Sequence, residues 1–207
     1  MDSGIDPGDL TGRARIRDAA VRHFGEYGFD KATIRGIAES AGVAASLVRH
    51  HFGSKEGLRD ACDEHLITML RRLNAEVWKS GVDAAGDVRP GPALGPYQRY
   101  LARALVEGRA GAVFDEIVTM HEQWLAATED PAEPLLGDRR ARATVRTAMA
   151  LSMAVLSEHV ARNLGEDPTS RAGESRLLRA LLDVQSRPQL TTEQAAAAAA
   201  ALGPTSD

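Results

Sequence analysis

The feature that most constrains this chain is residues 33–55, TIRGIAESAGVAASLVRHHFGSK, which predict two short helices joined by a glycine turn. In the first helix, apolar side chains recur at i, i+3, i+4 and i+7, the spacing of one helical face. Thr33 is expected to cap this helix, because its hydroxyl can accept from a free backbone N–H one turn in. Gly42 stands where the chain must turn, since glycine enters left-handed conformations without steric cost.

The second helix, expected at about residues 44–50, has one side fit to bury and an opposite side that is small, polar and cationic. Small residues let a helix approach a DNA groove closely, where Arg and His can reach phosphates or base edges. This arrangement is typical of a helix that reads DNA. The side expected to be buried consists of Ala44, Val48, His51 and Phe52; the other consists of Ala45, Ser46, Arg49 and His50, with Leu47 on the flank.

The patterns Thr-Ile-Arg-x-Ile-Ala, Ala-Gly-Val and His-His-Phe-Gly-Ser-Lys-Glu-Gly-Leu resemble the DNA-binding segment of TetR-family transcriptional regulators. Two positions depart from that family: Ala44 stands where Ser or Thr is frequent, and Arg49 where Tyr is common. The usual cap of the second helix is therefore absent, and an aromatic phosphate contact becomes a cationic one. The resemblance implies an N-terminal three-helix DNA-binding domain and a helical body that binds a small molecule and dimerises.

Within this arrangement, the exposed side of the second helix supplies the candidate DNA contacts. Ala45 or Leu47 suits contact with a thymine methyl group, and Arg35 or Arg49 could reach a guanine instead of a phosphate. The base-edge candidates are Ala45, Ser46 and Leu47, and the phosphate candidates are Thr33, Arg35, Arg49, His50 and Lys55.

Composition and charge agree with a helical DNA-binding protein. Of 207 residues, 43% are hydrophobic but only 4% aromatic, and no sustained period-two run predicts a strand. An all-α fold of about nine to ten helices is expected. The net charge is −4, yet residues 11–59 carry nine Lys/Arg against five Asp/Glu, and the remainder carries sixteen against twenty-four. A locally basic head on an acidic body keeps a local attraction to DNA while limiting non-specific binding.

Three parts are predicted: a disordered arm (1–10), a DNA-binding domain (11–57) and a helical ligand-binding and dimerisation domain (58–207). A cytoplasmic protein is expected, because there is one cysteine, Cys62, no secretory signal and no apolar stretch long enough to span a membrane. Cys62 is expected to be a core residue rather than a redox sensor. After helices at 11–27 and 55–79 and a linker at 80–96, further helices are expected at 97–106, 110–127, 139–164, 174–187 and 192–202.

The body helices suggest a dimer interface and a ligand pocket. Apolar stripes on helices 139–164 and 174–187 could form a four-helix interface or close one subunit's own core. The dimer is favoured because binding with two heads requires two subunits, and half-sites on one face of DNA lie about one turn, or 34 Å, apart. An apolar pocket is expected between helix 110–127 and the connecting helix, although the same residues could be core. The pocket candidates are Met69, Trp78, Phe114, Val118, His121, Trp124 and Leu125.

No motif for catalysis or metal binding accompanies these features. The chain lacks Gly-x-Ser-x-Gly, a phosphate-binding glycine loop and His-Glu-x-x-His, so no catalytic residue, cofactor or metal is expected. The sequence predicts a homodimeric regulator, with a repressor favoured over an activator, released from a palindromic operator by a small apolar or amphipathic ligand. The alternatives are a ligand-independent or activating regulator, a helical enzyme, and an interaction adaptor that uses the alanine-rich tail.

Overall fold

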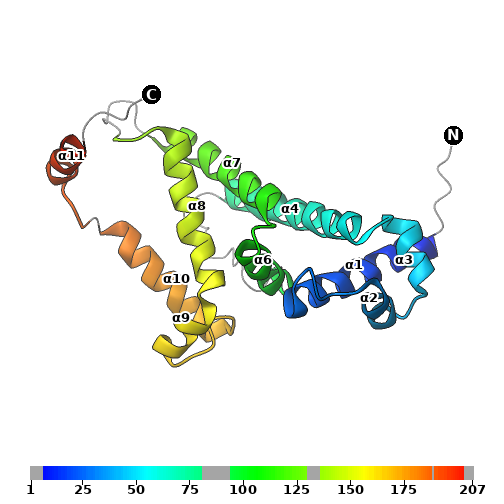
Figure 1. The fold of residues 1–207 in the computed structure, drawn as a ribbon. Helices are drawn as coiled ribbons and strands as arrows, with labels where there is room; N and C mark the ends of the chain where they lie inside the picture. The colour runs from blue at the N-terminus through cyan, green and yellow to red at the C-terminus, as the bar shows by residue number, and fades with distance from the viewer. Residues whose placement is uncertain (1–6, 81–93, 130–135, 188, 203–207) are drawn as a thin grey trace.

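The computed structural model describes residues 7–80, 94–129, 136–187 and 189–202, and in these ranges it has ten helices and no strand. Figure 1 shows an elongated molecule with α1–α3 at one end, α8–α11 at the other, and α4 running between them. The predicted all-α class is confirmed. We call α1–α3 the head and the helices after α4 the body.

The head consists of α1 (Pro7–Tyr27), α2 (Ile34–Ala41) and α3 (Ala45–Phe52). The inner face of α1 is buried as predicted, with Ile16 and Phe24 in the core, and the Phe24 and Phe29 rings are in contact at 5.5 Å between centroids. The helix begins at Pro7 rather than at residue 11, because proline suits the first helical position. The predicted arm is therefore too long; its residues 1–6 lie outside the described ranges.

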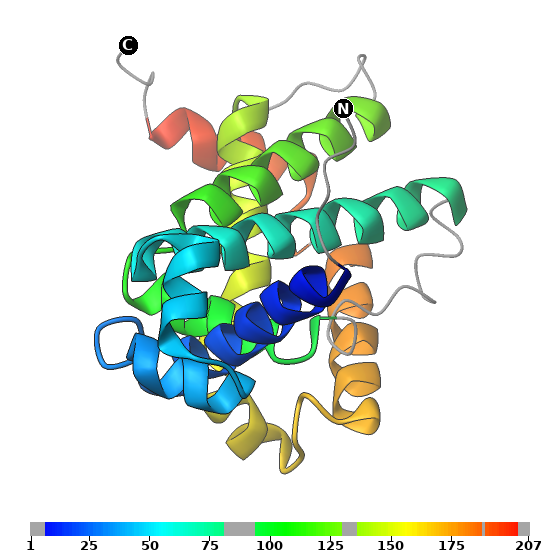
Figure 2. The same cartoon turned by 90° about the vertical axis from the view of Figure 1, so that its right-hand side faces the viewer.

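The connecting helix α4 (Lys55–Ser80) is continuous from the head into the body. Ser54 caps it as predicted, since its Oγ accepts from the Gly57 N–H at 3.0 Å. Leu58, Cys62 and Leu66 are buried in the hydrophobic core of the head, which continues into α6 and the start of α7. Burial raises the pKa of the Cys62 thiol, which supports the core interpretation over a reactive thiolate. Figure 2 shows α4 and α7 side by side above α1.

The first body helices are α6 (Tyr97–Val106), α7 (Gly111–Thr128), α8 (Arg139–Val155) and α9 (Ser157–Leu164). The bounds of α6 are those predicted. Helix α8 packs across α7 and α6, and the Arg140 guanidinium pairs with Glu122 of α7 at 3.0 Å. The single helix predicted over 139–164 is wrong, because Leu156 (φ −94°, ψ 16°) interrupts it. Leu156 carries no helix-breaking signal in the sequence.

The last described helices are α10 (Arg171–Ser186) and α11 (Thr192–Ala201). Helix α10 begins three residues before its predicted start, because the Ser170 Oγ accepts from the Gly173 N–H at 3.0 Å and caps it. The capping box predicted for Thr191 and Gln194 is confirmed. In Figure 1, α11 lies at the far end of the body. Most of the predicted linker, residues 81–93, lies outside the described ranges.

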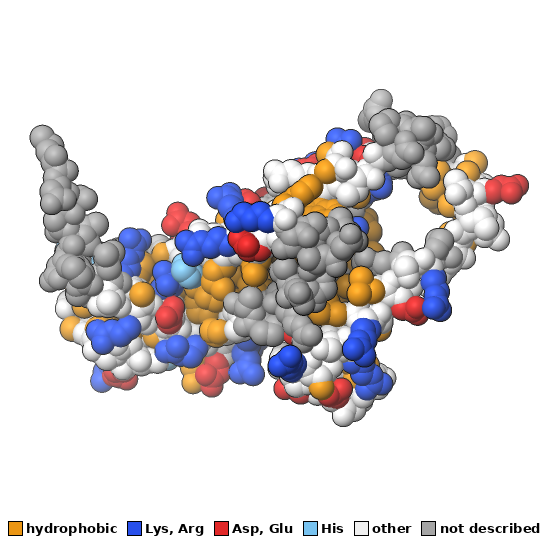
Figure 3. Space-filling model, turned by 180° about the vertical axis from the view of Figure 1, so that it is seen from behind, with side chains coloured by type: hydrophobic (Ala, Val, Ile, Leu, Met, Phe, Trp, Pro, Cys, Tyr) orange, Lys and Arg blue, Asp and Glu red, His pale blue; other side chains and the backbone are white. Residues whose placement is uncertain are grey.

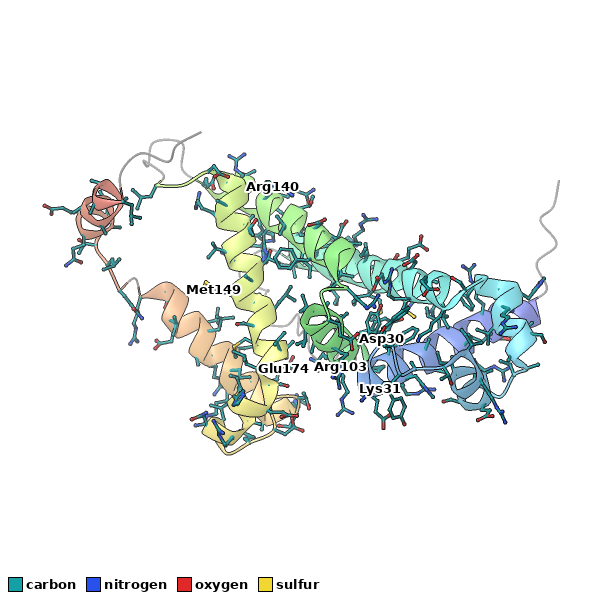
Figure 4. The ribbon with its side chains drawn as sticks, viewed as in Figure 1. Asp30, Lys31, Arg103, Arg140, Met149 and Glu174 are labelled. Atoms are coloured by element: carbon teal, nitrogen blue, oxygen red, sulfur yellow. The ribbon has the colours of Figure 1, made fainter. Side chains whose placement is uncertain are left out.

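Head and body are joined where α6 and the residues after it meet the end of α1. The Glu107 carboxylate accepts from the Phe29 N–H at 3.1 Å, and Arg109 pairs with Asp30 at 3.1 Å. Figure 4 shows Asp30 and Arg103 at this junction. The Tyr100 hydroxyl donates to Asp63 of α4 at 2.5 Å. The segment from α6 to Arg109 is therefore in direct contact with the end of α1 and with the loop that leads to α2, so a movement of α6 would move both.

Candidate nucleic-acid interface

The turn between α2 and α3 has the geometry that the sequence predicts. Thr33 caps α2, with its Oγ accepting from the Gly36 N–H at 3.1 Å. Gly42 is left-handed (φ 66°, ψ 40°), and the N–H groups of Gly42 and Val43 donate to the carbonyls of Glu39 and Ala38 at 3.1 and 3.0 Å. These bonds satisfy the carbonyls at the end of α2. They fix the direction in which α3 leaves the turn.

Helix α3 is anchored on one side and exposed on the other. Val48 is buried in the head core, whereas Ser46, Arg49 and His50 are exposed. Ala44 precedes the helix without a side-chain cap, as the sequence implies. The placement of Ala44 on the buried side is wrong, because as the N-cap residue it is exposed.

The two apolar candidates for base contact are each partly buried in the core and partly exposed to solvent. Ala45 and Leu47 are half-buried and pack against the head core. A DNA groove would therefore meet only the outer part of each side chain. Ser46 lies between them in the sequence and is exposed, which leaves it as the polar group of α3 best presented to a base edge.

The cationic candidates differ in how they are held. The Arg35 Nε pairs with Glu39 on the surface of α2 at 3.0 Å, an exposed i, i+4 pair that contributes about 0.3–0.5 kcal/mol and can be exchanged for a phosphate. The Lys55 ammonium instead donates to the Asp30 carbonyl at 3.1 Å and lies 4.5 Å from the centroid of the Phe29 ring. Its charge is therefore already engaged by groups of the protein.

Phe29 is the centre of a cation cluster that sequence reasoning missed. Lys55, Arg59 and Arg109 all place their charged groups over its ring, at 4.5–5.5 Å from the centroid. Arg109 follows Asp30, its ion-pair partner, by 79 residues, so no local pattern could have revealed the cluster. The cluster ties the start of α4 and the segment between α6 and α7 to the head.

On the face of the molecule seen from behind, the surface charges are mixed rather than gathered. Figure 3 shows Lys and Arg side chains interspersed with Asp and Glu on the face seen from behind. On α1, Arg15 and Arg22 are exposed, whereas Arg17 is half-buried. The Arg13 guanidinium lies 5.4 Å from the centroid of the Phe52 ring.

The predicted pocket residues lie on α4 and α7, but they play different parts. The rings of Trp78 and Trp124 are in contact at 5.3 Å between centroids, and Val118 is fully buried. The His121 Nδ1 is 2.8 Å from the Oγ1 of Thr147, which is fully buried on α8. Burial, assisted by Arg146, lowers the pKa of His121 to about 4. The remaining candidates, Met69, Phe114 and Leu125, are half-buried.

Comparison with known proteins agrees with the geometry of the head. Residues 16–62 match the family model described as bacterial regulatory proteins of the tetR family. The transcriptional regulatory protein RaaS of Mycobacterium tuberculosis is 39% identical over 144 residues, which are 65% of this chain and 66% of that one. The chain belongs to the TetR family. It is a helix-turn-helix transcriptional regulator, and its relatives are regulators rather than enzymes.

Other similarities of this TetR-family regulator are more restricted. A transcriptional repressor of Mycobacterium tuberculosis is 44% identical over 46 residues, 22% of this chain and 25% of that one. The crystal structure of a gamma-butyrolactone receptor, an ArpA-like protein, shares the fold with a TM-score of 0.58 and 22% identity, covering 86% of this chain and 99% of that one. No helix in the described ranges is long and apolar enough to cross a membrane. Nor do the described residues include a group of three or more His, Cys, Asp or Glu side chains that could hold a metal ion.

Proposed function

We propose that this TetR-family regulator is a homodimeric repressor that binds a palindromic operator through α3 of each subunit. The observation that carries the proposal is the asymmetry of α3. Val48 locks one side into the core, and the other side presents Ser46, Arg49 and His50 to solvent. A rigid helix with an exposed hydroxyl and cations suits the major groove. Thr33 and Arg35, both exposed at the start of α2, supply further phosphate contacts.

The body supports the homodimer. Helices α8 and α10 present large apolar side chains that do not close the subunit's own core, each between 39% and 63% exposed. Apolar surface gathered on two helices is typical of an interface, and α8 and α10 of two subunits would form a four-helix contact. The exposed side chains are Val145, Met149, Met153 and Val155 on α8, and Leu181, Leu182 and Val184 on α10.

Release of the operator follows from a ligand that enters the body between α4 and α7. The gamma-butyrolactone receptor, which has the same fold, is named for a small molecule with polar and apolar parts. A ligand that separates α4 from α7 would move α6. The contacts of Glu107 and Arg109 with the head would transmit this movement to the DNA-binding helices. Such a ligand acts as an inducer only if it binds the released arrangement more tightly than the DNA-bound one.

The repressor role is supported by a relative named as a transcriptional repressor, whose 46 aligned residues are 44% identical. Repression requires only that the dimer occupy its operator. In activation, a further contact with the transcription machinery would be needed.

Selection of bound fragments from random duplex DNA tests the proposal. The full-length protein is expected to enrich an inverted repeat whose half-site centres are about one helical turn apart, or a multiple of it. Log affinity for that site should fall linearly with log salt, by about 0.9 for each phosphate neutralised. If no sequence is enriched at low salt, the proposal of operator recognition is refuted. If a single asymmetric half-site is enriched, the proposal of a dimer is refuted.

A further inference from the structure

The turn between α1 and α2, residues 28–31, is held from the body by two charged residues that follow α6. The Glu107 carboxylate accepts from the Phe29 N–H at 3.1 Å. The Arg109 guanidinium pairs with Asp30 at 3.1 Å and lies 4.5 Å from the centroid of the Phe29 ring. In Figure 4, Asp30 lies beside the end of α6. The turn that leads into the DNA-binding helices is therefore fastened to a segment 78 to 79 residues later in the chain.

Two glycines at the end of α1 let the body come directly against this turn. Gly28 is left-handed (φ 79°), and a Cβ at this position would collide with the Oε1 of Glu107. Three residues earlier, a Cβ at Gly25 would lie 3.0 Å from the backbone nitrogen of Tyr100 in α6. Close packing of this kind leaves no flexible side chain between the two parts to absorb a displacement. A movement of α6 relative to the turn must therefore break these contacts or move the turn.

The same turn is also bonded to the residue at which α4 begins. The Lys55 ammonium donates to the Asp30 carbonyl at 3.1 Å, and Lys55 follows Phe52, the last residue of α3, by three positions. At its other end the turn leads into α2, which Thr33 caps. The turn thus contacts both ends of the helix-turn-helix unit, and the two residues after α6 fasten that unit to the body.

This second attachment restricts how the head can rotate. Helix α4 runs continuously from the head into the body, and a head joined to a body through one helix alone can pivot about it. The packing of α6 on α1 and the contacts of Glu107 and Arg109 form a connection outside α4. Together the two connections fix the direction of α3 relative to the body.

The direction of each head determines which operators a dimer can occupy. One extra base pair between two half-sites moves one of them by about 3.4 Å along the DNA axis and by about 35° around it. Heads that are fixed to the body cannot follow this change, whereas heads that pivot can. Discrimination between half-site spacings is therefore a property of the connection between head and body, not of the base contacts of α3.

We propose that Glu107 and Arg109 are positioning residues that set the half-site spacing accepted by the dimer. They act through the turn at residues 28–31 and leave the base sequence of each half-site to α3. This role rests on the proposed homodimer, and it states where in the chain the spacing preference is encoded.

Selection from random duplex DNA, carried out in parallel with the full-length wild type and with the double variant Glu107→Ala/Arg109→Gln, tests this role. The wild type is expected to enrich an inverted repeat with one separation between half-sites. The double variant should enrich the same half-site sequence at several separations. In anisotropy titrations, the preference for the matched repeat over one lengthened by a central base pair should fall by about tenfold, because a fixed linkage of two heads contributes about 10²–10⁴ in affinity.

Two further variants separate positioning from general stability. Glu107→Gln keeps an oxygen that can accept from the Phe29 N–H, so it should keep the single separation of the wild type. Glu129→Ala removes a carboxylate that pairs with Arg139 and Arg142 within the body. It is expected to lower the melting temperature while leaving the spacing preference unchanged. If the double variant fails to fold in circular dichroism melts, Glu107→Ala alone is used, with the same expected direction.

The outcomes against this role are distinct from those against the homodimer. A single separation retained by the double variant would refute the role of Glu107 and Arg109 while leaving the dimer intact. Relaxed spacing in Glu129→Ala as well would assign the effect to lost stability, and a changed half-site sequence in the double variant would assign it to α3. A wild type that enriches no inverted repeat would refute the proposed homodimer on its operator, and this role with it.

Discussion

Arg49 and Lys55 lie six positions apart on either side of Gly53, but their charges are in different environments. Arg49 is exposed on the outer side of α3. The Lys55 ammonium is held by the Asp30 carbonyl and the Phe29 ring. A cation that already has partners within the protein must give them up before it can bind a phosphate. The two residues, which the sequence places in one group of phosphate contacts, should therefore behave differently when each is neutralised.

Arg49→Gln is expected to weaken binding to all duplexes alike and to flatten the slope of log affinity against log salt by about 0.9. Lys55→Gln should leave the slope unchanged and lower the free energy of unfolding by about 1 kcal/mol, through loss of the hydrogen bond and the cation–π contact. Fluorescence anisotropy over a salt series measures the first effect, and urea unfolding measures the second. If Lys55→Gln flattens the slope as much as Arg49→Gln, Lys55 is a phosphate contact.

His121 makes the stability of the body depend on pH. Its pKa falls from 6.5 in the unfolded chain to about 4 in the folded protein, through burial and then Arg146. Between these values the unfolded state binds more protons, so stability is complete above pH 6.5 and is lost as the pH falls toward 4. The loss should be about 2 kcal/mol, given the partial exposure of the ring. Urea unfolding of the wild type and His121→Gln at pH 7 and pH 4.5 measures it; an equal loss of stability in both proteins would exclude His121 as the cause.

At the scale of elements, the sequence predicts the helices well wherever a local signal marks their ends. Thr33, Gly42, Ser54 and Thr191 lie at the helix ends that they were expected to mark, because capping and left-handed turns depend on neighbouring residues alone. The break at Leu156 could not be predicted, since the apolar spacing continues through it and no glycine or proline stands there.

The candidate site divides in the same way, because its local features could be predicted from the sequence and its long-range contacts could not. The exposed side of α3 was predicted from 100° spacing, because the helix rests on one buried residue, Val48. Whether Lys55 faces DNA or Asp30, and whether the predicted pocket residues enclose a space or fill it, depends on contacts between distant segments. Neither could be settled by spacing along the chain.

Gly25 tests how closely head and body are fitted. A Cβ at this position of α1 would lie 3.0 Å from the Tyr100 backbone nitrogen and 3.3 Å from the Arg99 carbonyl carbon. Backbone of α6 cannot yield without moving the helix, so Gly25→Ala is expected to destabilise the protein by about 1–3 kcal/mol.

Gly12 is the matched control on the same helix. Its Cβ would meet only the His51 ring, at an ordinary 3.9 Å, so Gly12→Ala should stabilise the protein by up to about 1 kcal/mol through helix propensity. Both variants are compared by urea unfolding. Stabilisation by both substitutions would show that α1 and α6 are not packed this closely.

At the scale of the whole molecule, the exposed apolar side chains of α8 and α10 determine whether two heads act together. Met149 is among the most exposed of them, at 63%, and Figure 4 shows it on α8 on the side toward α10. If α8 and α10 form the dimer interface, Met149→Asp places a carboxylate in it. Burial of an uncompensated charge costs several kcal/mol, so the dimer dissociation constant should rise by about 100-fold or more.

Val106→Asp provides the control, because Val106 is similarly exposed, at 69%, but lies on α6. Analytical ultracentrifugation should show a dimer for the wild type and Val106→Asp, and a monomer for Met149→Asp at the same concentration. Met149→Asp should then bind an isolated half-site as the wild type does, while losing its preference for the full palindrome, because its two heads are no longer linked. A Met149→Asp dimer as stable as the wild type would place the interface elsewhere, and a wild-type monomer would leave the apolar faces of α8 and α10 to a different partner.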